Sequence, residues 1–276
     1  MNLLTQTQIS AYERCKRLYY LKYVRRLVWP VETTARRNVD QGESFHLLVR
    51  QLLMGFPREK LLFPGEDEEV SRWIGVFLQA RPLEGARHVM AEKELSALLA
   101  DVLWLGKFDA LAVKDDRLVI YDWKTGKAVP DAARYHTSPQ TRLYRFLAKM
   151  NACRLTGSAL HEFPAENIEM IYWFPEYPDQ PVRLPYSEEE FQQDVTWLHM
   201  TAREMCAGDE EDYPRTVITK RCRFCDYRTY CFPESQVYTE DQELPEQDGE
   251  PADEIFQTDF FSVEGFSDTD REETVF

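Results

Sequence analysis

The sequence contains no run of about 18 consecutive apolar residues, so we expect no membrane-spanning helix. Its first residues, Met1 to Ser10, also lack the basic region and apolar core that mark a secretory signal peptide. We therefore predict a cytoplasmic protein. Because thiols stay reduced in that compartment, the cysteines are expected to be free thiols or metal ligands rather than disulfides.

An excess of basic residues is absent from the chain as a whole, which has a net charge of −15 over 276 residues. The acidity is concentrated in residues 234–276, where fifteen acidic residues and one arginine account for −14 and leave −1 for residues 1–233. We predict a folded domain over residues 1–233 and a disordered acidic tail over residues 234–276. The tail could solubilise the protein, restrain it by mimicking nucleic acid, or dock a partner.

Two apolar segments in the middle of the chain, Leu105–Asp109 and Leu118–Trp123, have the composition of β-strands. The polar sequence Lys114–Arg117 between them is typical of a hairpin turn. Side chains two residues apart on a strand share a face, so Asp122 and Lys124 should point away from the face that carries Tyr121 and Trp123.

These charged residues should converge if the two strands pair, because Asp109 then approaches the end of the sheet that carries Asp122 and Lys124. Carboxylates bind hard divalent cations, and a lysine can orient a water molecule or stabilise a developing oxyanion. A solvated charged pair on a strand is the alternative reading of Asp122 and Lys124 taken alone.

The order Asp109, Asp122-x-Lys124, Thr125-Gly126 resembles the PD-(D/E)XK nuclease superfamily in its RecB-like branch. Phe108-Asp109 stands in place of the Pro-Asp dipeptide, and Asp122 stands in place of the more frequent glutamate. The resemblance implies an α/β fold over residues 1–233, with a restriction-endonuclease-like central mixed sheet flanked by helices. It further implies an iron–sulfur cap that joins the N- and C-terminal ends of the domain.

Other residues gain expected roles from the same resemblance. The Gly-x-x-x-His sequence that ends at His46 implies that this histidine binds Mg²⁺ or Mn²⁺ together with Asp109 and Asp122. Gln140 and Tyr144 match a Gln-x-x-x-Tyr motif that lies beside the active site and contacts DNA. Glu92 is an additional candidate, although a surface carboxylate on an edge strand explains it equally well.

Three cysteines occur as Cys222-x2-Cys225-x5-Cys231, a spacing that indicates a metal site in a cytoplasmic chain. A fourth thiolate is needed, and Cys15 is the candidate. Zinc is the usual ion of four thiolates. One distant N-terminal cysteine followed by this C-terminal group resembles the iron–sulfur branch of these nucleases, which includes the CRISPR-associated RecB-like exonucleases and the nuclease domain of the AddB helicase subunit. The resemblance implies a 4Fe–4S cluster.

The N-terminal segment mixes basic and aromatic residues, a combination that suits single-stranded nucleic acid. For most of its tyrosines we nevertheless expect inward packing. A capping box at Ser10 and Glu13 predicts a helix from Ser10 to about Val24. The remaining expected elements are helices over Gln41–Met54 and Asp67–Ala80, strands over His88–Leu95 and Ile168–Phe174, a loop over Lys127–Thr137, a helix capped by Ser138, and a helix over Ser187–Cys206.

The resemblance implies a metal-dependent deoxyribonuclease, an exonuclease on single-stranded ends, acting in DNA repair, recombination or CRISPR adaptation with protein partners that could dock on the tail. Two alternatives remain open. The chain could be an iron–sulfur DNA-binding partner subunit with little cleavage of its own, or a zinc-stabilised interaction module.

Overall fold

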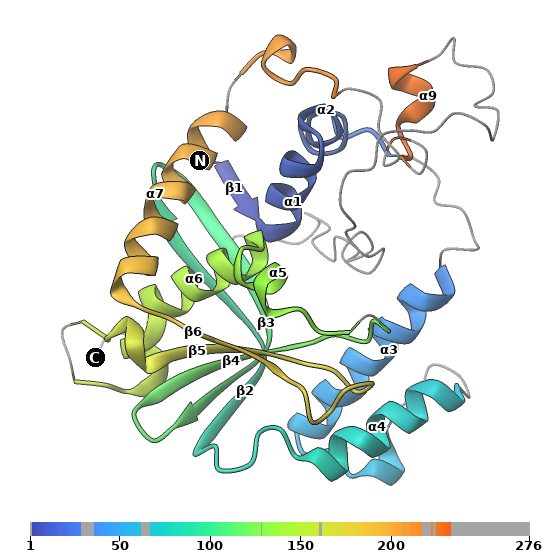
Figure 1. Ribbon diagram of the computed structural model, residues 1–276, viewed down its shortest axis with the longest axis vertical. Helices are drawn as coiled ribbons and strands as arrows, with labels where there is room; N and C mark the ends of the chain where they lie inside the picture. The colour runs from blue at the N-terminus through green and yellow to red at the C-terminus, as the bar shows by residue number, and fades with distance from the viewer. Residues whose placement is uncertain are drawn as a thin grey trace, which may run out of the picture.

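The computed structural model describes residues 2–28, 36–61, 67–127, 129–159, 162–206, 208–216, 222 and 225–232. The predicted tail, residues 234–276, lies outside this part. The described residues form one mixed sheet with helices on both faces (Figure 1), which confirms the predicted α/β architecture. None of the described helices is long and apolar enough to cross a membrane.

The sheet consists of six strands in the order β1-β3-β4-β5-β6, with β2 on the other side of β3. The pairs β2–β3, β3–β4 and β5–β6 are antiparallel, whereas β1–β3 and β4–β5 are parallel. The predicted strand over His88–Leu95 is longer than expected, and β1 and β6 were not predicted. The strands are β1 (Asn2–Thr5), β2 (His88–Leu99), β3 (Val102–Lys114), β4 (Arg117–Trp123), β5 (Ile168–Trp173) and β6 (Val182–Pro185).

One edge of β3 is shared by two strands that lie in line with each other. Residues 102–105 of β3 pair with β1, and residues 110–114 pair with β4. Residues 106–109 have no ladder partner on that edge among the described strands. A notch therefore opens in the sheet at the point where β3 and β4 part, and Asp109 lies in it.

Helices α3 and α4 cover one face of the sheet, and α1 and α6 cover the other (Figure 1). Helix α7 packs on the outside of α6. The side chains of Ser138 and Ser187 cap α6 and α7 as predicted. The helices are α1 (Gln6–Arg14), α2 (Lys16–Tyr19), α3 (Arg36–Leu53), α4 (Glu68–Ala80), α5 (Ala132–His136), α6 (Pro139–Thr156), α7 (Glu188–Met205) and α9 (Arg228–Cys231), with short 3₁₀ turns at Arg58–Lys60, Ala165–Asn167 and Glu210–Asp212 and a π-helical turn at Tyr20–Val24.

The predicted N-terminal helix is wrong at its start and in its continuity. It begins at Gln6, because Thr5 and Gln8 form the capping box that we assigned to Ser10 and Glu13. It is also broken at Cys15, which has extended backbone between α1 and α2. The loop expected over Lys127–Thr137 likewise contains the short helix α5. The tyrosines at positions 12, 19 and 20 are buried, which confirms inward packing rather than an exposed stacking surface.

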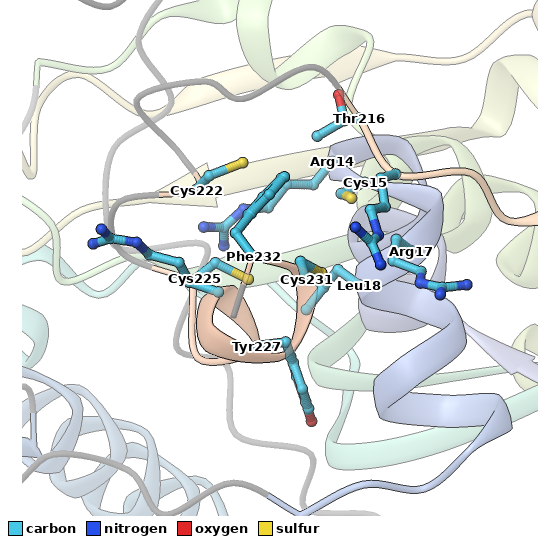
Figure 2. A pocket seen from close by; sticks show the side chains of 12 residues that line it. Arg14, Cys15, Arg17, Leu18, Thr216, Cys222, Cys225, Tyr227, Cys231 and Phe232 are labelled. Atoms are coloured by element: carbon cyan, nitrogen blue, oxygen red, sulfur yellow. The ribbon is translucent and has the colours of Figure 1, made fainter. Parts of the chain in front are cut away.

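The two ends of the described chain pack against each other. The Tyr12 hydroxyl donates to Glu204 at 3.0 Å, and the Tyr227 hydroxyl donates to the Leu27 carbonyl at 2.6 Å. Figure 2 shows the result: Cys15, at the junction of α1 and α2, faces the C-terminal segment that carries Cys222, Cys225 and Cys231.

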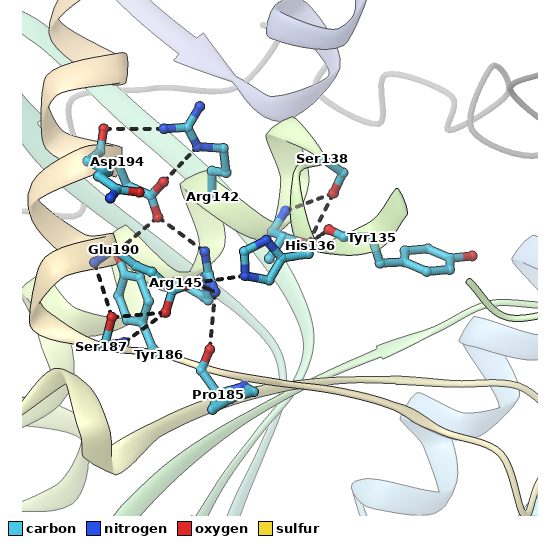
Figure 3. A network of polar contacts seen from close by, with 12 residues as sticks. Tyr135, His136, Ser138, Arg142, Arg145, Pro185, Tyr186, Ser187, Glu190 and Asp194 are labelled. Carbon is cyan, nitrogen blue, oxygen red and sulfur yellow. Dashed lines mark hydrogen bonds and ion pairs between the residues drawn. The ribbon is translucent and has the colours of Figure 1, made fainter. Parts of the chain in front are cut away.

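A buried ionic network fixes α6 against its neighbours (Figure 3). Arg145 of α6 is 2% exposed and lies 3.1 Å from Glu190 and 3.6 Å from Asp194, both on α7. Arg142 donates to the same Asp194 at 2.6 Å, and His136 of α5 contacts Glu190 at 2.8 Å. Because buried charges are costly unless paired, this network determines where the first turns of α6 lie.

Candidate active site

Helix α3 brings His46 to the notch from one face of the sheet. The imidazole Nδ1 lies 3.0 Å from Asp109 Oδ1. One helical turn before His46, Gly42 lies against the loop that follows β4. A Cβ atom at this position would be 3.2 Å from Thr125 Oγ1. The Gly-x-x-x-His pattern thus has a physical reason: glycine lets the helix approach Thr125, and the residue one turn later reaches Asp109.

Asp122 of β4, Lys124 just after that strand and Gln140 of α6 approach from the other face and form a closed triangle. The Gln140 amide nitrogen donates to Asp122 Oδ1 at 2.6 Å, and the Gln140 amide oxygen accepts from Lys124 Nζ at 2.9 Å. Lys124 Nζ lies 3.0 Å from Asp122 Oδ2. The structure therefore confirms that Asp122 and Lys124 point the same way, and it adds Gln140 as the residue that orients both.

The two halves meet through the backbone of β4. Asp109 Oδ2 accepts a hydrogen bond from the Trp123 N–H at 2.8 Å, just beyond the last ladder pair of β3 and β4. Tyr121 and Trp123 are buried under α3 and α4, on the face opposite Asp122. The predicted convergence of Asp109, Asp122 and Lys124 is therefore present.

A paired distortion of β2 and β3 directs Asp109 into the notch. Along β3, Phe108 packs on the α6 face and Leu111 does too, so alternation is interrupted between them. The same happens in β2 between Met90 and Leu95, while the one-to-one register continues. Glu92, opposite Asp109 in this register, has a left-handed φ of 46°. At these two facing irregularities, the alternation of side chains shifts by one residue in both strands, so that odd positions take over the face that even positions had occupied.

Tyr144 lies behind the site rather than on its surface. It is 4% exposed, its ring centroid lies 4.4 Å from that of Phe108, and its hydroxyl donates to the Lys107 carbonyl at 2.6 Å. Gly106 leaves space for this ring, since a Cβ there would lie 3.1 Å from a Tyr144 ring carbon. The hydrogen bond satisfies a β3 carbonyl in the stretch where the ladder with β4 is missing.

The pKa values of the two carboxyl groups are shifted in opposite directions. Burial raises the pKa of Asp122 to about 6, against the opposing charge of Lys124 and with a further increase from Asp109. Burial acts the same way on Asp109, but the charge and hydrogen bond of His46 and the Trp123 N–H hold the pKa of Asp109 below its ordinary value. The charge of Asp109 in turn raises the pKa of His46 despite its burial.

The donor set suits a hard divalent cation. Asp122 Oδ2 is buried, and Lys124 Nζ lies 3.0 Å from it as an ion-pair partner. A buried carboxylate next to a second carboxylate and an imidazole has the chemistry of a Mg²⁺ or Mn²⁺ site. Within the described residues, no three His, Cys, Asp or Glu side chains are already gathered closely enough to hold an ion.

Glu92, the additional candidate, contacts other residues than those predicted to bind metal. Its Oε2 lies 2.9 Å from Arg50 NH1 and 3.0 Å from Lys107 Nζ. Sequence reasoning missed both cations. A signal was available for Arg50, which follows His46 by one helical turn, but not for Lys107, because the alternation of β3 is interrupted at Asp109.

The four predicted cysteine ligands line one cavity (Figure 2). All are free thiols, and Arg14, Arg17 and Arg215 line the same cavity. Burial raises the pKa of Cys225 and of Cys231, and neighbouring thiols including Cys15 raise it further. The other two cysteines, Cys153 and Cys206, do not line this cavity.

Comparison with known proteins relates this geometry to one family. The sequence pattern of the PD-(D/E)XK nuclease superfamily matches residues 3–232. A crystal structure described as a "putative exonuclease" of Eubacterium rectale has a TM-score of 0.50 and 8% identity, covering 88% of this chain and 91% of its own, and shows the fold alone. That of SSO0001 has a TM-score of 0.39 and 15% identity, covering 85% and 88%, and carries no argument. No curated protein matches the chain significantly.

The family pattern covers nearly the whole described chain and includes every residue gathered at the notch. The sheet and its flanking helices agree with that assignment. This chain therefore belongs to the PD-(D/E)XK nuclease superfamily.

Proposed function

We propose that this protein is a metal-dependent deoxyribonuclease of the RecB-like branch, which hydrolyses phosphodiester bonds from the ends of single-stranded DNA. The observation that carries the proposal is the triangle of Asp122, Lys124 and Gln140 beside the His46–Asp109 pair. Two carboxylates, an imidazole and an ammonium group within one notch are the groups that hydrolysis of a phosphodiester with a divalent cation requires.

Asp109, Asp122 and His46 would hold Mg²⁺ or Mn²⁺, which when bound polarises the phosphate and lowers the pKa of water. The imidazole must be neutral to act as a ligand. Lys124 is fixed by Asp122 and Gln140, and its ammonium group would orient the attacking water and stabilise the negative charge that develops on the phosphate.

Gln140 acts in this proposal as the residue that keeps Lys124 and Asp122 in place. Its amide orientation follows from its partners, a carboxylate for the nitrogen and an ammonium group for the oxygen. Tyr144 is buried, so its contribution would be to hold β3 beside the substrate rather than to stack on a base.

We further propose a 4Fe–4S cluster held by Cys15, Cys222, Cys225 and Cys231. The shared cavity supports this set of ligands. A single zinc ion would place every sulfur about 2.3 Å from one centre. A 4Fe–4S cluster carries its own iron and sulfide between the cysteines, and the resemblance of the cysteine spacing to the iron–sulfur branch favours it. Zinc would be the outcome that contradicts this assignment.

The biological setting remains a prediction: DNA repair, recombination or CRISPR adaptation in the cytoplasm, with protein partners that could bind the tail. The shared cysteine cavity also favours the second candidate, an iron–sulfur DNA-binding subunit with little cleavage of its own. The two candidates differ in one measurable property, which is the rate at which the isolated chain cleaves DNA.

The decisive experiment compares anaerobically purified wild type with Lys124→Ala on linear and circular single-stranded DNA in Mg²⁺ or Mn²⁺, with iron measured in the same samples. Loss of the oriented cation should reduce kcat by at least about 100-fold. Lys114→Ala is the matched control, because this lysine lies at the far end of β3. Cleavage of linear DNA by wild type and by the control, but not by Lys124→Ala, is expected.

The other possible outcomes of this experiment would contradict parts of the proposed function. Equal cleavage by Lys124→Ala would remove this lysine from the active site, and cleavage of circular DNA would replace an exonuclease by an endonuclease. DNA binding and bound iron without cleavage would favour the partner subunit.

A further inference from the structure

A second charged layer lies directly beside the notch. On α3, Arg50 follows His46 by four residues and so shares its face of the helix, and on β3, Lys107 lies two residues before Asp109. The first layer is the His46–Asp109 contact. The second is Arg50, Glu92 and Lys107, about 6 Å along the helix and about 6.8 Å along the strand from the first.

One carboxylate oxygen organises this second layer. Oε2 of Glu92 lies 2.9 Å from Arg50 NH1 and 3.0 Å from Lys107 Nζ. Two cations share one anion, so these three side chains sum to a net charge of +1, and Glu94 lies opposite Lys107 in the β2–β3 register. The Arg50 and Lys107 side chains are 44% and 34% exposed, whereas Glu92 is 21% exposed. The positive groups therefore face solvent above a carboxylate that fixes them.

The backbone at Glu92 is arranged for this contact. Its φ of 46° lies in the left-handed region, which is uncommon for residues other than glycine. The register of its neighbours places Glu92 opposite Asp109. The irregularity that turns Asp109 into the notch thus also turns Glu92 toward Arg50 and Lys107, so both layers depend on the same distortion of the sheet.

A purely structural role accounts poorly for the arrangement. Partly exposed ion pairs contribute little to stability, typically below about 1 kcal/mol. That gain does not explain two cations on one oxygen held by a left-handed residue. The spacing of the layers is comparable to that between neighbouring nucleotides of an extended single strand, which carries one negative charge per phosphate.

We propose that Arg50 and Lys107, positioned by Glu92, form a binding site for the phosphate next to the one that is cleaved. The inference rests on the proposed function and extends it by naming a substrate subsite. The ligand is a DNA phosphodiester, bound by charge and by N–H donors without recognition of a base. The two cations would fix the register of the strand, so that only one phosphodiester lies over the notch.

The test measures binding of a short single-stranded oligonucleotide in Mg²⁺ at several salt concentrations, with Lys124→Ala as the background to prevent cleavage. Adding Lys107→Ala or Arg50→Ala should weaken binding about tenfold and reduce the slope of log affinity against log salt by about 0.7 each. Lys107→Arg should restore the slope. Arg183→Ala is the control, because Arg183 is paired with Glu169 at the sheet edge and should leave the slope unchanged.

A neutral methylphosphonate, introduced at one position of the oligonucleotide at a time, locates the contact. With Arg50 and Lys107 intact, one position beside the cleaved bond should lower affinity, and the Arg50→Ala/Lys107→Ala double variant should no longer sense it. Glu92→Gln keeps both cations, so the salt slope should persist while the positional difference shrinks.

The outcomes separate this inference from the proposed function. Cleavage by otherwise wild-type protein together with an unchanged salt slope in the Arg50 and Lys107 variants would overturn the subsite and leave the nuclease intact. Failure of the wild type to bind or cleave DNA would overturn both. A lower Tm in these variants without any change of slope would assign the layer to stability alone.

Discussion

The carboxylate of Asp109 accepts the backbone N–H of Trp123 at 2.8 Å, where the next ladder bond between β3 and β4 would have formed. A side chain therefore completes the hydrogen bonding of β4 at the point where the strands part. The other oxygen of the same carboxylate faces His46. The position of this carboxylate is thus fixed by the sheet itself and does not depend on a flexible loop.

Asp122→Asn should stabilise the metal-free protein at neutral pH while abolishing cleavage. The folded pKa of about 6 lies above the unfolded value of about 3.9, so folding favours the protonated carboxyl group. The resulting penalty is absent below pH 4, develops between these pKa values and is complete above pH 6. Asparagine removes a penalty of the order of 3 kcal/mol, since the pKa values differ by about 2 units and one pKa unit corresponds to about 1.4 kcal/mol.

Urea unfolding in EDTA at pH 4 and pH 7.5 checks this prediction. The variant should gain stability at pH 7.5 and match the wild type at pH 4, because its amide oxygen can still accept from Gln140. A loss of stability at pH 7.5 would show that Asp122 is not strained in the absence of a cation.

Gly42→Ala should reduce cleavage several-fold, because its Cβ would lie 3.2 Å from Thr125 Oγ1 and displace α3 together with His46. Gly75→Ala is the control, since no atom lies within 4 Å of a Cβ there, and it should gain about 0.5–1 kcal/mol from helix propensity. Cleavage rates and Tm measure both effects. The Gly42→Ala/Thr125→Ala double variant should recover activity, and failure to recover would exclude this contact as the cause.

Asp194→Ala should destabilise the fold by about 3–5 kcal/mol, because it leaves Arg142 and the buried Arg145 without their shared carboxylate. Thermal or urea unfolding measures the loss. Arg154→Ala is the control and should change stability little, because Arg154 is exposed near the end of α6, the helix that carries Arg142 and Arg145. A change below 1 kcal/mol in Asp194→Ala would mean that the network in Figure 3 is not important for stability.

Cys15→Ala should lower both the iron content and the Tm. The proposed cluster would connect α1 to residues 222–231, and closing so long a loop restricts the unfolded chain. Iron analysis and thermal unfolding under anaerobic conditions measure the two effects. Cys153→Ala serves as the control, since it lies outside the cavity. Unchanged iron and Tm in Cys15→Ala would remove Cys15 from the ligand set.

The parts of the site that follow local rules could be predicted from the sequence. Strand alternation placed Asp122 and Lys124 on one face, and the N-cap at Ser138 placed Gln140 in the first turn of α6. Both rules act over a few residues, so the neighbouring sequence suffices to apply them.

The parts of the fold and the site that depend on distant contacts could not be predicted from the sequence. Nothing in residues 2–5 shows that they pair with β3, and the short strand has no pattern of its own. The interrupted side-chain alternation at Glu92 and Asp109 could not be predicted either. It occurs in both strands at once, and the register stays one-to-one, so no inserted residue marks it in the sequence. The capping box at Ser10 and Glu13 fits the local pattern, but the helix begins at Gln6, directly after the strand residue Thr5 that pairs with β3.

The pairing of the chain ends has a consequence for biosynthesis. Strand β1 is synthesised well before its partner residues 102–105, and the partner of Leu27, Tyr227, is 200 residues away. The apolar side chains of this N-terminal segment therefore stay exposed until those partners have been synthesised. We expect the segment to be among the last to become fixed in the fold.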